Sequence, residues 1–413
     1  MTSPRIELPP AKALQSALRK TTETLARELA QPTDRAPDWS DFEWLVARAV
    51  AAMHGVSPLL SGALRWRGPP GWSEFLQDQR AHTVARHPRI MELLRLIDAR
   101  ARADGIAVVA LKGAQLHSSG LYAPGERPMA DVDLLVQAGD LNRATRMLES
   151  LGFHESLSTW RDRVFVPEYE RAPCDLGEHT DNYLKVELHE RIQEALPVDI
   201  VDISARIFPA RAQPGLNPYP SNASLMLHLV LHAAGAMVSR TLRLLHLNDL
   251  ALLSLRMTDA DWVEMLEQGG HGRECWWALP PLQLMAQYYP GAAPARVLAA
   301  LADQCPPLLG MFARRRTLSD VSLSSMWIQA FPGIEWSRSV SETARYIARR
   351  VAPSPEMVEL RRRLAQTQVA PAASKWHHLP QGRRMLRWLT SRQTRADTMH
   401  AVRTALAQTR QAT

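Results

Sequence analysis

Lysine, cysteine and long apolar runs are all scarce in this chain of 413 residues. Each scarcity limits the classes of protein and of binding site that the sequence can form. The three cysteines are widely spaced and odd in number, which argues against a disulfide framework and against a cysteine-rich zinc site. No apolar run approaches the roughly 18 residues that cross a bilayer, and the first residues lack the apolar stretch of a signal peptide. The sequence therefore predicts a cytoplasmic protein without a membrane span.

Lysine is rare because arginine supplies nearly all of the positive charge. The five lysines are Lys12, Lys20, Lys112, Lys185 and Lys375. A lysine that is kept in such a chain indicates a need for a compact ammonium group, for example beside a phosphate. Two of the five, Lys112 and Lys185, lie in the segments that carry the most informative motifs.

Positive charge is concentrated toward the C-terminus. Residues 311–413 carry 18 Lys and Arg against 6 Asp and Glu, whereas residues 1–310 carry 31 against 36. Such a basic region would suit a nucleic acid or a phosphorylated partner. No RNA- or DNA-binding motif accompanies it, and arginines scattered over helices usually form solvated faces. We therefore expect no specific binding to nucleic acid.

Two aspartates separated by one residue form the centre of the most informative segment, Arg127–Val136. In a strand, residues i and i+2 point to the same face, so Asp131 and Asp133 would lie side by side while Val132 turns into the core. Carboxylates held this close repel each other unless a cation lies between them. A strand end with two solvated carboxylates is the alternative, but the apolar surroundings favour a hard divalent cation such as Mg²⁺.

A third carboxylate follows in the segment Tyr183–His189, which alternates between polar and apolar residues. The pattern predicts a strand with Lys185, Glu187 and His189 on one face. If this strand pairs beside the aspartate strand, Glu187 completes a cluster of three carboxylates.

A turn before the aspartates could bind an anion. The apolar run Ile106–Leu111 predicts a buried strand, and Lys112 and Gly113 lead from it into a helix. Gly113 allows close backbone approach to a phosphate, and a helix N-terminus offers free N–H groups, although a plain strand-to-helix turn would have the same sequence. Lys112 would neutralise phosphate charge. Arg127 would either bind a phosphate through two hydrogen bonds or pair with a neighbouring carboxylate, Glu126 or Asp131.

Histidines occur at positions 189, 228 and 232, and the last two are spaced i, i+4 on one helical face. A zinc-protease helix with this spacing carries Glu directly after the first histidine, and here Leu229 stands there. We interpret these histidines as hydrogen-bonding groups, with His189 orienting Glu187.

The motifs together resemble a known superfamily, the polymerase-β-like nucleotidyltransferases. They are most similar to a bacterial branch of uncharacterised nucleotidyltransferases, whose motifs stand here at Leu111–Gly113, Arg127–Leu135 and Glu187–His189. The similarity extends from about Trp44 through the helical segments Leu225–Ala234, Leu242–Leu252 with Asp249, and Tyr346–Val358. One departure concerns the nucleotide turn, where the superfamily usually has Gly-Ser or Gly-Gly and this chain has Gly113-Ala114. The serine hydroxyl that contacts a phosphate is therefore absent.

The resemblance implies an α+β fold with a polymerase-β-like nucleotidyltransferase core, a short mixed sheet flanked by helices. Helical regions would precede and follow this core. The expected parts are an N-terminal helical region (1–100), the core (101–200), a helical domain lining the cleft (201–310) and a basic, mostly helical C-terminal region (311–413).

The resemblance also implies a reaction. The enzyme would move a nucleoside monophosphate from a nucleoside triphosphate, with ATP one candidate, to a hydroxyl or phosphate of an unidentified small molecule, sugar, peptide or protein. Two Mg²⁺ ions would be held by the catalytic residues Asp131, Asp133 and Glu187, and pyrophosphate would leave. The nucleotide would contact Lys112, Gly113, Arg127 and Lys185. Two alternatives stay open, namely a non-catalytic nucleotide-binding or regulatory protein on the same fold, and a transferase of the γ-phosphate.

Overall fold

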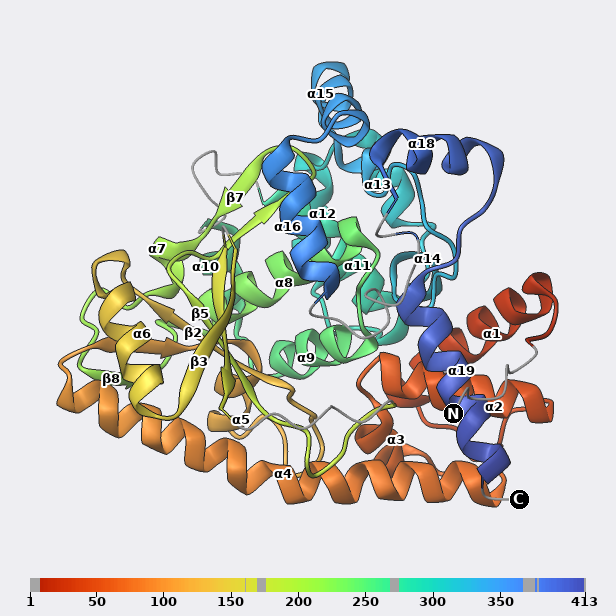
Figure 1. Ribbon diagram of the computed structural model, residues 1–413, viewed down its shortest axis with the longest axis horizontal. Helices are drawn as coiled ribbons and strands as arrows, with labels where there is room; N and C mark the ends of the chain where they lie inside the picture. Colours follow the sequence, from red (N-terminus) through yellow and green to blue (C-terminus); the bar gives the residue numbers. More distant parts are fainter. Residues whose placement is uncertain are drawn as a thin grey trace.

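The computed structural model describes residues 8–159, 161–168, 176–267, 275–366, 376 and 379–411, and combines many helices with one main sheet (Figure 1). The helices before the sheet are α1 (Ala11–Ala30), α2 (Asp41–Met53), α3 (Ser57–Ala63) and α4 (Pro70–Ala103). Helix α2 begins as the sequence predicts: the Ser40 hydroxyl accepts a hydrogen bond from the Glu43 N–H, and the Glu43 carboxylate accepts one from the Ser40 N–H.

Helix α4 is much longer than the amphipathic stretch that the sequence predicts at Ile90–Arg102. It runs for 34 residues along the lower edge of the molecule and passes through Pro88 (Figure 1). A proline inside a helix removes one backbone hydrogen bond, so packing must compensate. The part before Pro88 packs in one core through Phe75, and the part after it packs in a second core through Ile97. One helix therefore ties both cores together.

The main sheet has six strands in the order β3-β4-β5-β2-β1-β8. Its strands are β1 (Ala107–Ala110), β2 (Asp131–Val136), β3 (Phe153–Ser158), β4 (Asp162–Pro167), β5 (Lys185–His189) and β8 (Gly215–Asn217). Strand β2 pairs antiparallel with β1 and parallel with β5, so the sheet is mixed as expected. A separate hairpin joins β6 (Gln193–Ala195) and β7 (Ile200–Asp202). Strands β4, β6, β7 and β8 were not predicted, because each is short or lacks a clear alternating pattern.

The second core lies between the main sheet and helices α4 and α6 (Leu141–Ser150). It contains Val132 and Leu134 from β2 and Val186 and Leu188 from β5. The opposite faces of these strands carry the polar residues of the motifs. The alternation predicted for both strands is therefore confirmed.

The larger core is helical and joins segments from nearly the whole chain. Its remaining helices are α5 (Lys112–Ser118), α7 (Ser204–Ile207), α8 (Asn222–Ser239), α9 (Leu244–Ser254), α10 (Asp259–Glu267), α11 (Leu279–Tyr288), α12 (Ala295–Gln304), α13 (Pro307–Ala313), α14 (Leu318–Val321) and α19 (Ala396–Gln411). Helix α19 lies against α2 and buries Val402 and Ala405 there (Figure 1). Helix α19 therefore packs onto the N-terminal helices through an apolar stripe. The division into four parts stays a prediction.

Helix α8 corrects one expectation about apolar runs. Its 18 residues have a mean hydropathy of 1.3 with at most two charged residues, so it is long and apolar enough to cross a membrane. The sequence reading overlooked it because uncharged histidines and small polar residues interrupt the pattern. In the fold 83% of this stretch is buried against other parts of the protein, which is typical of a core helix. The absence of a membrane span and a cytoplasmic location stay predictions.

The C-terminal helices α15 (Val340–Val351), α16 (Pro355–Gln366) and α18 (Gln381–Thr390) lie together at the top of Figure 1. Several apolar side chains of these helices stay exposed, among them Val351 (40% exposed) and Val358 (47% exposed). Arginines on the same helices limit how closely the two can pack onto the rest of the fold.

Candidate active site

Strands β2 and β5 bring the predicted carboxylates together. In their parallel register Asp133 lies opposite Glu187, and Asp131 lies opposite Lys185. Because paired residues of neighbouring strands share a face, all four side chains point to the side of the sheet away from the second core. The sequence could predict each strand but not this register.

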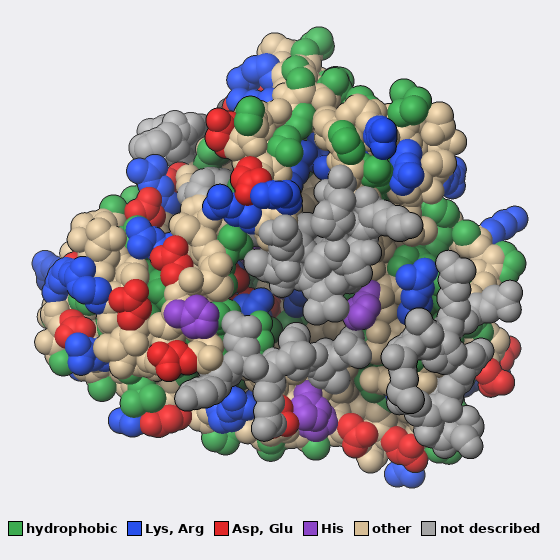
Figure 2. Space-filling view, in the orientation of Figure 1, with side chains coloured by type: hydrophobic (Ala, Val, Ile, Leu, Met, Phe, Trp, Pro, Cys, Tyr) green, Lys and Arg blue, Asp and Glu red, His purple; other side chains and the backbone are tan. Residues whose placement is uncertain are grey.

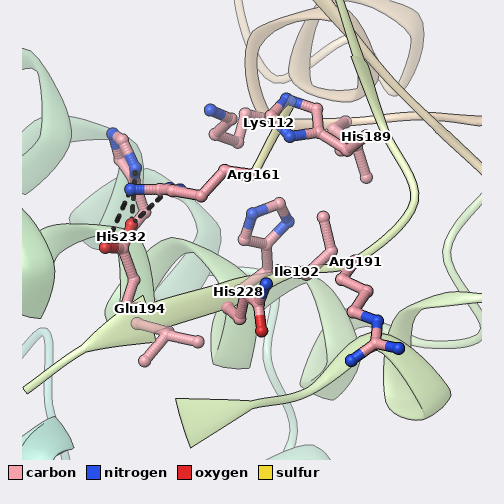
Figure 3. A pocket seen from close by; sticks show the side chains of 11 residues that line it. Lys112, Arg161, His189, Arg191, Ile192, Glu194, His228 and His232 are labelled. Carbon is pink, nitrogen blue, oxygen red and sulfur yellow. Dashed lines mark hydrogen bonds and ion pairs between the residues drawn. The ribbon is translucent and has the colours of Figure 1, made fainter. Parts of the chain in front are cut away.

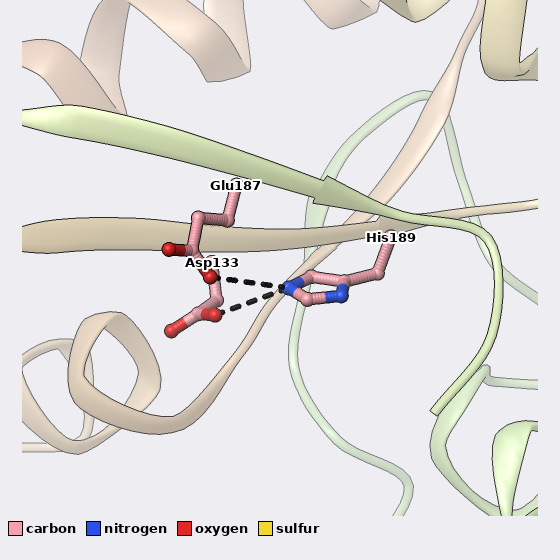
Figure 4. Close-up of side chains that lie close together, drawn as sticks. All are labelled: Asp133, Glu187 and His189. Atoms are coloured by element: carbon pink, nitrogen blue, oxygen red, sulfur yellow. Dashed lines mark hydrogen bonds and ion pairs between the residues drawn. The ribbon is translucent and has the colours of Figure 1, made fainter. Parts of the chain in front are cut away.

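Asp133 is the centre of the cluster (Figure 4). Its Oδ1 accepts a hydrogen bond from the Lys112 ammonium at 2.8 Å and one from Nε2 of His189 at 3.1 Å. Side-chain ligand atoms of Asp133, Glu187 and His189 all lie within 4.8 Å of one another. Burial opposes ionisation of Asp133, but Lys112 and His189 outweigh it and hold the pKa of this carboxyl well below its ordinary value. Asp133 is therefore a carboxylate at neutral pH.

The other two carboxyl groups have the opposite tendency. Burial, together with the charges of Asp133 and Asp131, raises the pKa of Glu187 to about 8. Burial and Asp133 likewise raise the pKa of Asp131, against Lys112, Arg243 and Lys185. Groups whose pKa values are pushed apart in one site are suited to different tasks, such as binding a cation and taking up a proton.

Lys112 reaches Asp133 from the turn between β1 and α5. Its backbone has a positive φ of 42°, which L-residues rarely adopt, so the turn is held by other contacts. The Lys112 N–H donates to the Tyr219 hydroxyl at 3.2 Å, and that hydroxyl donates to Nδ1 of His228 at 2.7 Å. Burial alone would lower the pKa of Lys112, but Asp133, Glu187 and Asp131 raise it, so the side chain is charged. The cation between the carboxylates is therefore supplied by the protein itself.

Arg127 is engaged elsewhere. Its Nε and Nη2 donate to the two carboxylate oxygens of Asp249 in α9 at 2.9 and 2.8 Å, and Nη1 donates to the Pro128 carbonyl at 3.3 Å. Both charged side chains are buried. The carboxylate that pairs with Arg127 is neither Glu126 nor Asp131 but a residue 122 positions away, and contact of Arg127 with a phosphate stays a prediction. Side chains so far apart in sequence cannot be paired by inspection of a motif.

Gly113 serves this arrangement. A Cβ atom at this position would lie 2.6 Å from Nη1 of Arg127 and 3.0 Å from the Met129 sulfur. The close approach that requires glycine is thus made by the Arg127 side chain. Helix α5, which follows, has only seven residues. These observations favour a structural role for Gly113 and Arg127, and their contact with a nucleotide stays a prediction.

A small pocket, partly open to solvent, lies beside the carboxylates (Figure 3). Lys112 and His189 form one side of it and α8 forms the other. Arg161 crosses the pocket and donates to both carboxylate oxygens of Glu194 at 2.8 and 3.1 Å. The sequence analysis missed Arg161 and Glu194, because neither belongs to a recognisable motif.

The helix α8 histidines line the same pocket as neutral groups. Burial, and then the charge of Lys112, lowers the pKa of His228 and of His232 well below the ordinary value. His228 accepts a hydrogen bond from Tyr219, and Nδ1 of His232 lies 4.0 Å from Glu194. Their interpretation as hydrogen-bonding groups is confirmed for His228. Nε2 of His189 contacts Asp133 and also lies 4.0 Å from a Glu187 carboxylate oxygen, and its role in orienting Glu187 stays a prediction.

Comparison with known proteins places this site in a family. The model of a family described as uncharacterised nucleotidyltransferases matches residues 40–289, more than half of the chain. The chain belongs to this family. The match begins near Trp44, as the motifs suggest, but ends before the segment Tyr346–Val358. No curated protein and no solved structure matches the chain.

The residues present at this site fit a hard divalent cation. Asp133 and Glu187 offer two carboxylates from adjacent strands, and Mg²⁺ is commonly held by one or two carboxylates together with substrate phosphates. Nε2 of His189 already donates to Asp133, so this ring orients the carboxylate. Asp131 is outside the close group but near enough to perturb Glu187.

The raised pKa of Glu187 predicts how stability depends on pH in the metal-free protein. A group that holds its proton more tightly when folded contributes stability below its unfolded pKa of 4.5 and loses it as pH rises through its folded pKa of about 8. We expect the free energy of unfolding in EDTA to fall by a few kcal/mol over this window. Urea unfolding of Glu187→Gln should show a flatter profile. An identical slope in the variant would contradict the assignment.

Proposed function

We propose that this protein is a Mg²⁺-dependent nucleotidyltransferase that moves a nucleoside monophosphate from a nucleoside triphosphate to an acceptor hydroxyl or phosphate. The observation that carries the proposal is the register that sets Asp133 opposite Glu187, with Lys112 bonded to Asp133, inside the matched family region. A short mixed sheet with helices on its flanks also suits a polymerase-β-like core.

The carboxylates and the lysines of this site would have separate tasks. Asp131, Asp133 and Glu187 would hold two Mg²⁺ ions, which when bound would neutralise triphosphate charge and activate the acceptor oxygen. The Lys112 ammonium, released from Asp133, would turn on its flexible stem toward the triphosphate. Lys185, opposite Asp131, would contribute further positive charge.

The reaction would proceed by in-line attack. The acceptor oxygen bonds to the α-phosphorus, the bond from that phosphorus to the bridging oxygen breaks, and pyrophosphate leaves. Glu187 would either hold the second Mg²⁺ or take up the acceptor proton, a task that suits a carboxyl group whose pKa is raised to about 8 in the metal-free protein. The pocket walled by α8 would receive the acceptor, and its charged groups Arg161 and Glu194 suggest a polar or ionic one.

The function is tested with two labels on one triphosphate. The protein, Mg²⁺ and host extract are incubated with each of the four triphosphates, labelled at the α-phosphate or at the γ-phosphate. We expect the α label to appear on an acceptor and the γ label in pyrophosphate. Transfer of the γ label to the acceptor would replace the proposal by phosphoryl transfer. Tight binding without transfer of either label would favour a non-catalytic nucleotide-binding protein. Asp133→Asn serves as the inactive control.

Lys112→Met is expected to raise the KM for the triphosphate by about tenfold or more. A hydrogen bond to a charged group contributes roughly 1.5–3 kcal/mol, and about 1.4 kcal/mol corresponds to a factor of ten. Steady-state kinetics over a range of triphosphate concentrations measure the effect. Lys20→Met, which removes an exposed lysine paired with Glu43 in the N-terminal helices, is the matched control. An unchanged KM in Lys112→Met would exclude the phosphate contact.

A further inference from the structure

The C-terminal helices α15, α16 and α18 carry a second cluster of charged groups, outside the matched family region of residues 40–289. The sequence between Glu359 and Asp397 contains nine Lys and Arg residues and no Asp or Glu. Figure 2 shows Lys and Arg side chains on this face of the molecule over α16 and α18. The acidic residues of α16, Glu356 and Glu359, precede this stretch, and Glu359 pairs with Arg362 and Arg363, so the excess of positive charge lies in the residues that follow.

Two arginines enclose a pair of tryptophans. The guanidinium carbon of Arg350 lies 5.4 Å from the ring centre of Trp388, and that of Arg384 lies 5.2 Å from the ring centre of Trp376. The two indole rings are 5.5 Å apart. The Gln381 side-chain amide donates to the Arg350 carbonyl at 2.8 Å, which ties the start of α18 to the end of α15. The arrangement is thus held by both helices.

The described residues supply few acceptors for the N–H groups of these arginines. Arg350 uses its Nε on the Ala330 carbonyl at 2.9 Å, whereas Nε of Arg384 is buried and has no hydrogen-bond partner in the described part of the chain. Arg361, on α16, forms no ion pair with any described carboxylate. Stacking on an aromatic ring contributes roughly 0.5–2 kcal/mol, but it cannot satisfy these donors.

The charges of Arg350 and Arg384 act on Arg361. Burial, and then the charges of Arg350 and Arg384, lowers the pKa of Arg361 to about 10. No carboxylate offsets this repulsion, and a guanidinium with such a pKa is still charged at neutral pH. Three positive charges are therefore held together with free donors and no counter-charge from the described residues.

We propose that Arg350, Arg361 and Arg384 form a binding site for a phosphate-bearing ligand, separate from the proposed active site. A phosphate group brings several acceptor oxygens and the negative charge that the cluster lacks, and guanidinium groups bind it through paired hydrogen bonds. The phosphate belongs either to a soluble phosphorylated compound or to an anionic lipid headgroup. Leu386 and Leu389, 60% and 83% exposed on α18, would suit the second source.

The first arm of the test uses inorganic pyrophosphate in EDTA, so that metal-dependent binding at Asp133 is suppressed. Isothermal titration of the full-length protein should show binding that weakens at least tenfold in Arg361→Gln. Arg362→Gln is the matched control, because Arg362 is exposed and already paired with Glu359, and it should bind like the wild type. Without ligand, Arg361→Gln should unfold at the same or a higher temperature, because it relieves repulsion, so weaker binding would not reflect a damaged fold.

The second arm uses sedimentation with vesicles of phosphatidylcholine, alone or with phosphatidylglycerol, at about 150 mM salt, where screening acts over roughly 8 Å. Retention on the anionic vesicles only, lost in Arg361→Gln and in the double variant Leu386→Ser, Leu389→Ser, would assign the lipid headgroup. Binding of pyrophosphate without retention would assign a soluble ligand.

Three outcomes would overturn the proposal. The first is equal behaviour of the wild type and Arg361→Gln with both probes. The second is pyrophosphate binding that Lys112→Met abolishes and Arg361→Gln leaves unchanged, which would assign it to the active site. The third is a sequence-selective complex with nucleic acid at about 10⁻⁸ M, the range typical of specific nucleic-acid binding.

Discussion

Asp133→Asn is expected to lower the rate of nucleotidyl transfer by about a thousandfold or more. Losing a carboxylate that binds a catalytic cation removes several kcal/mol of transition-state stabilisation, and each 1.36 kcal/mol or so corresponds to a factor of ten in rate. Asp133 is the residue to change because it contacts Lys112 and His189 and lies opposite Glu187. Transfer of the α label under saturating Mg²⁺ measures the effect, and wild-type rates would refute the assignment.

The same substitution should also reduce stability, whereas Asp131→Asn should not. From the sequence alone, both changes relieve repulsion between like charges and are expected to be neutral or stabilising. The structure reverses this for Asp133, because the variant leaves the largely buried Lys112 ammonium without its closest partner, at a cost of about 2 kcal/mol or more. Asp131 has a raised pKa, so its charge is unfavourable in the fold and an amide relieves it. Urea unfolding of both variants in EDTA separates the two effects.

The contrast between Asp131 and Asp133 shows which features of the site the sequence predicts and which it does not. Alternation of apolar and polar residues predicts β2 and β5 and the face that each aspartate occupies, because these follow from local strand geometry. The sequence left open which strands pair and in which register. The structure sets Glu187 beside Asp133 and Lys185 beside Asp131, and thereby separates the environments of two residues that the motif treats alike.

Contacts between distant segments were beyond the sequence altogether. The sequence predicts that Lys112 contacts a phosphate. In the fold its ammonium group approaches Asp133 and supplies the counter-charge of that carboxylate. Arg161 directly precedes β4 and Glu194 lies in the three-residue strand β6, and neither segment shows a clear pattern, so their place in the pocket could not be foreseen. Side-chain partners of this kind depend on the packing of the whole fold, not on local preference.

Arg127 belongs to the same motif as the aspartates, but its bond to Asp249 indicates a structural role. The Tyr122 hydroxyl donates to the same carboxylate at 2.6 Å and accepts from the Asn248 side chain at 2.9 Å. The side-chain oxygen Oδ1 of Asn248 in turn accepts a hydrogen bond from the Tyr289 hydroxyl at 3.1 Å. This buried network joins the segment before β2 to α9 and α11, and so fixes the aspartate strand against the helical part of the fold.

Arg127→Met is therefore expected to lower the free energy of unfolding by about 3–5 kcal/mol, the loss typical when one member of a buried ion pair is removed. The reason is that Asp249 keeps a charge in a site where its side chain is only 3% exposed. Chemical denaturation followed by circular dichroism measures the loss. Asp249→Leu alone should lower the free energy of unfolding by a similar amount, because it leaves the buried Arg127 guanidinium without its carboxylate partner.

The double variant Arg127→Met, Asp249→Leu decides whether the pair itself is responsible. Replacing both members of a buried ion pair by apolar groups is often close to neutral, so the double variant should lose much less than the sum of the two single losses. If the losses simply add, the bond between Arg127 and Asp249 contributes little. If Arg127→Met is as stable as the wild type but binds triphosphate poorly, Arg127 is a nucleotide ligand after all, and the aspartate strand is positioned by other contacts.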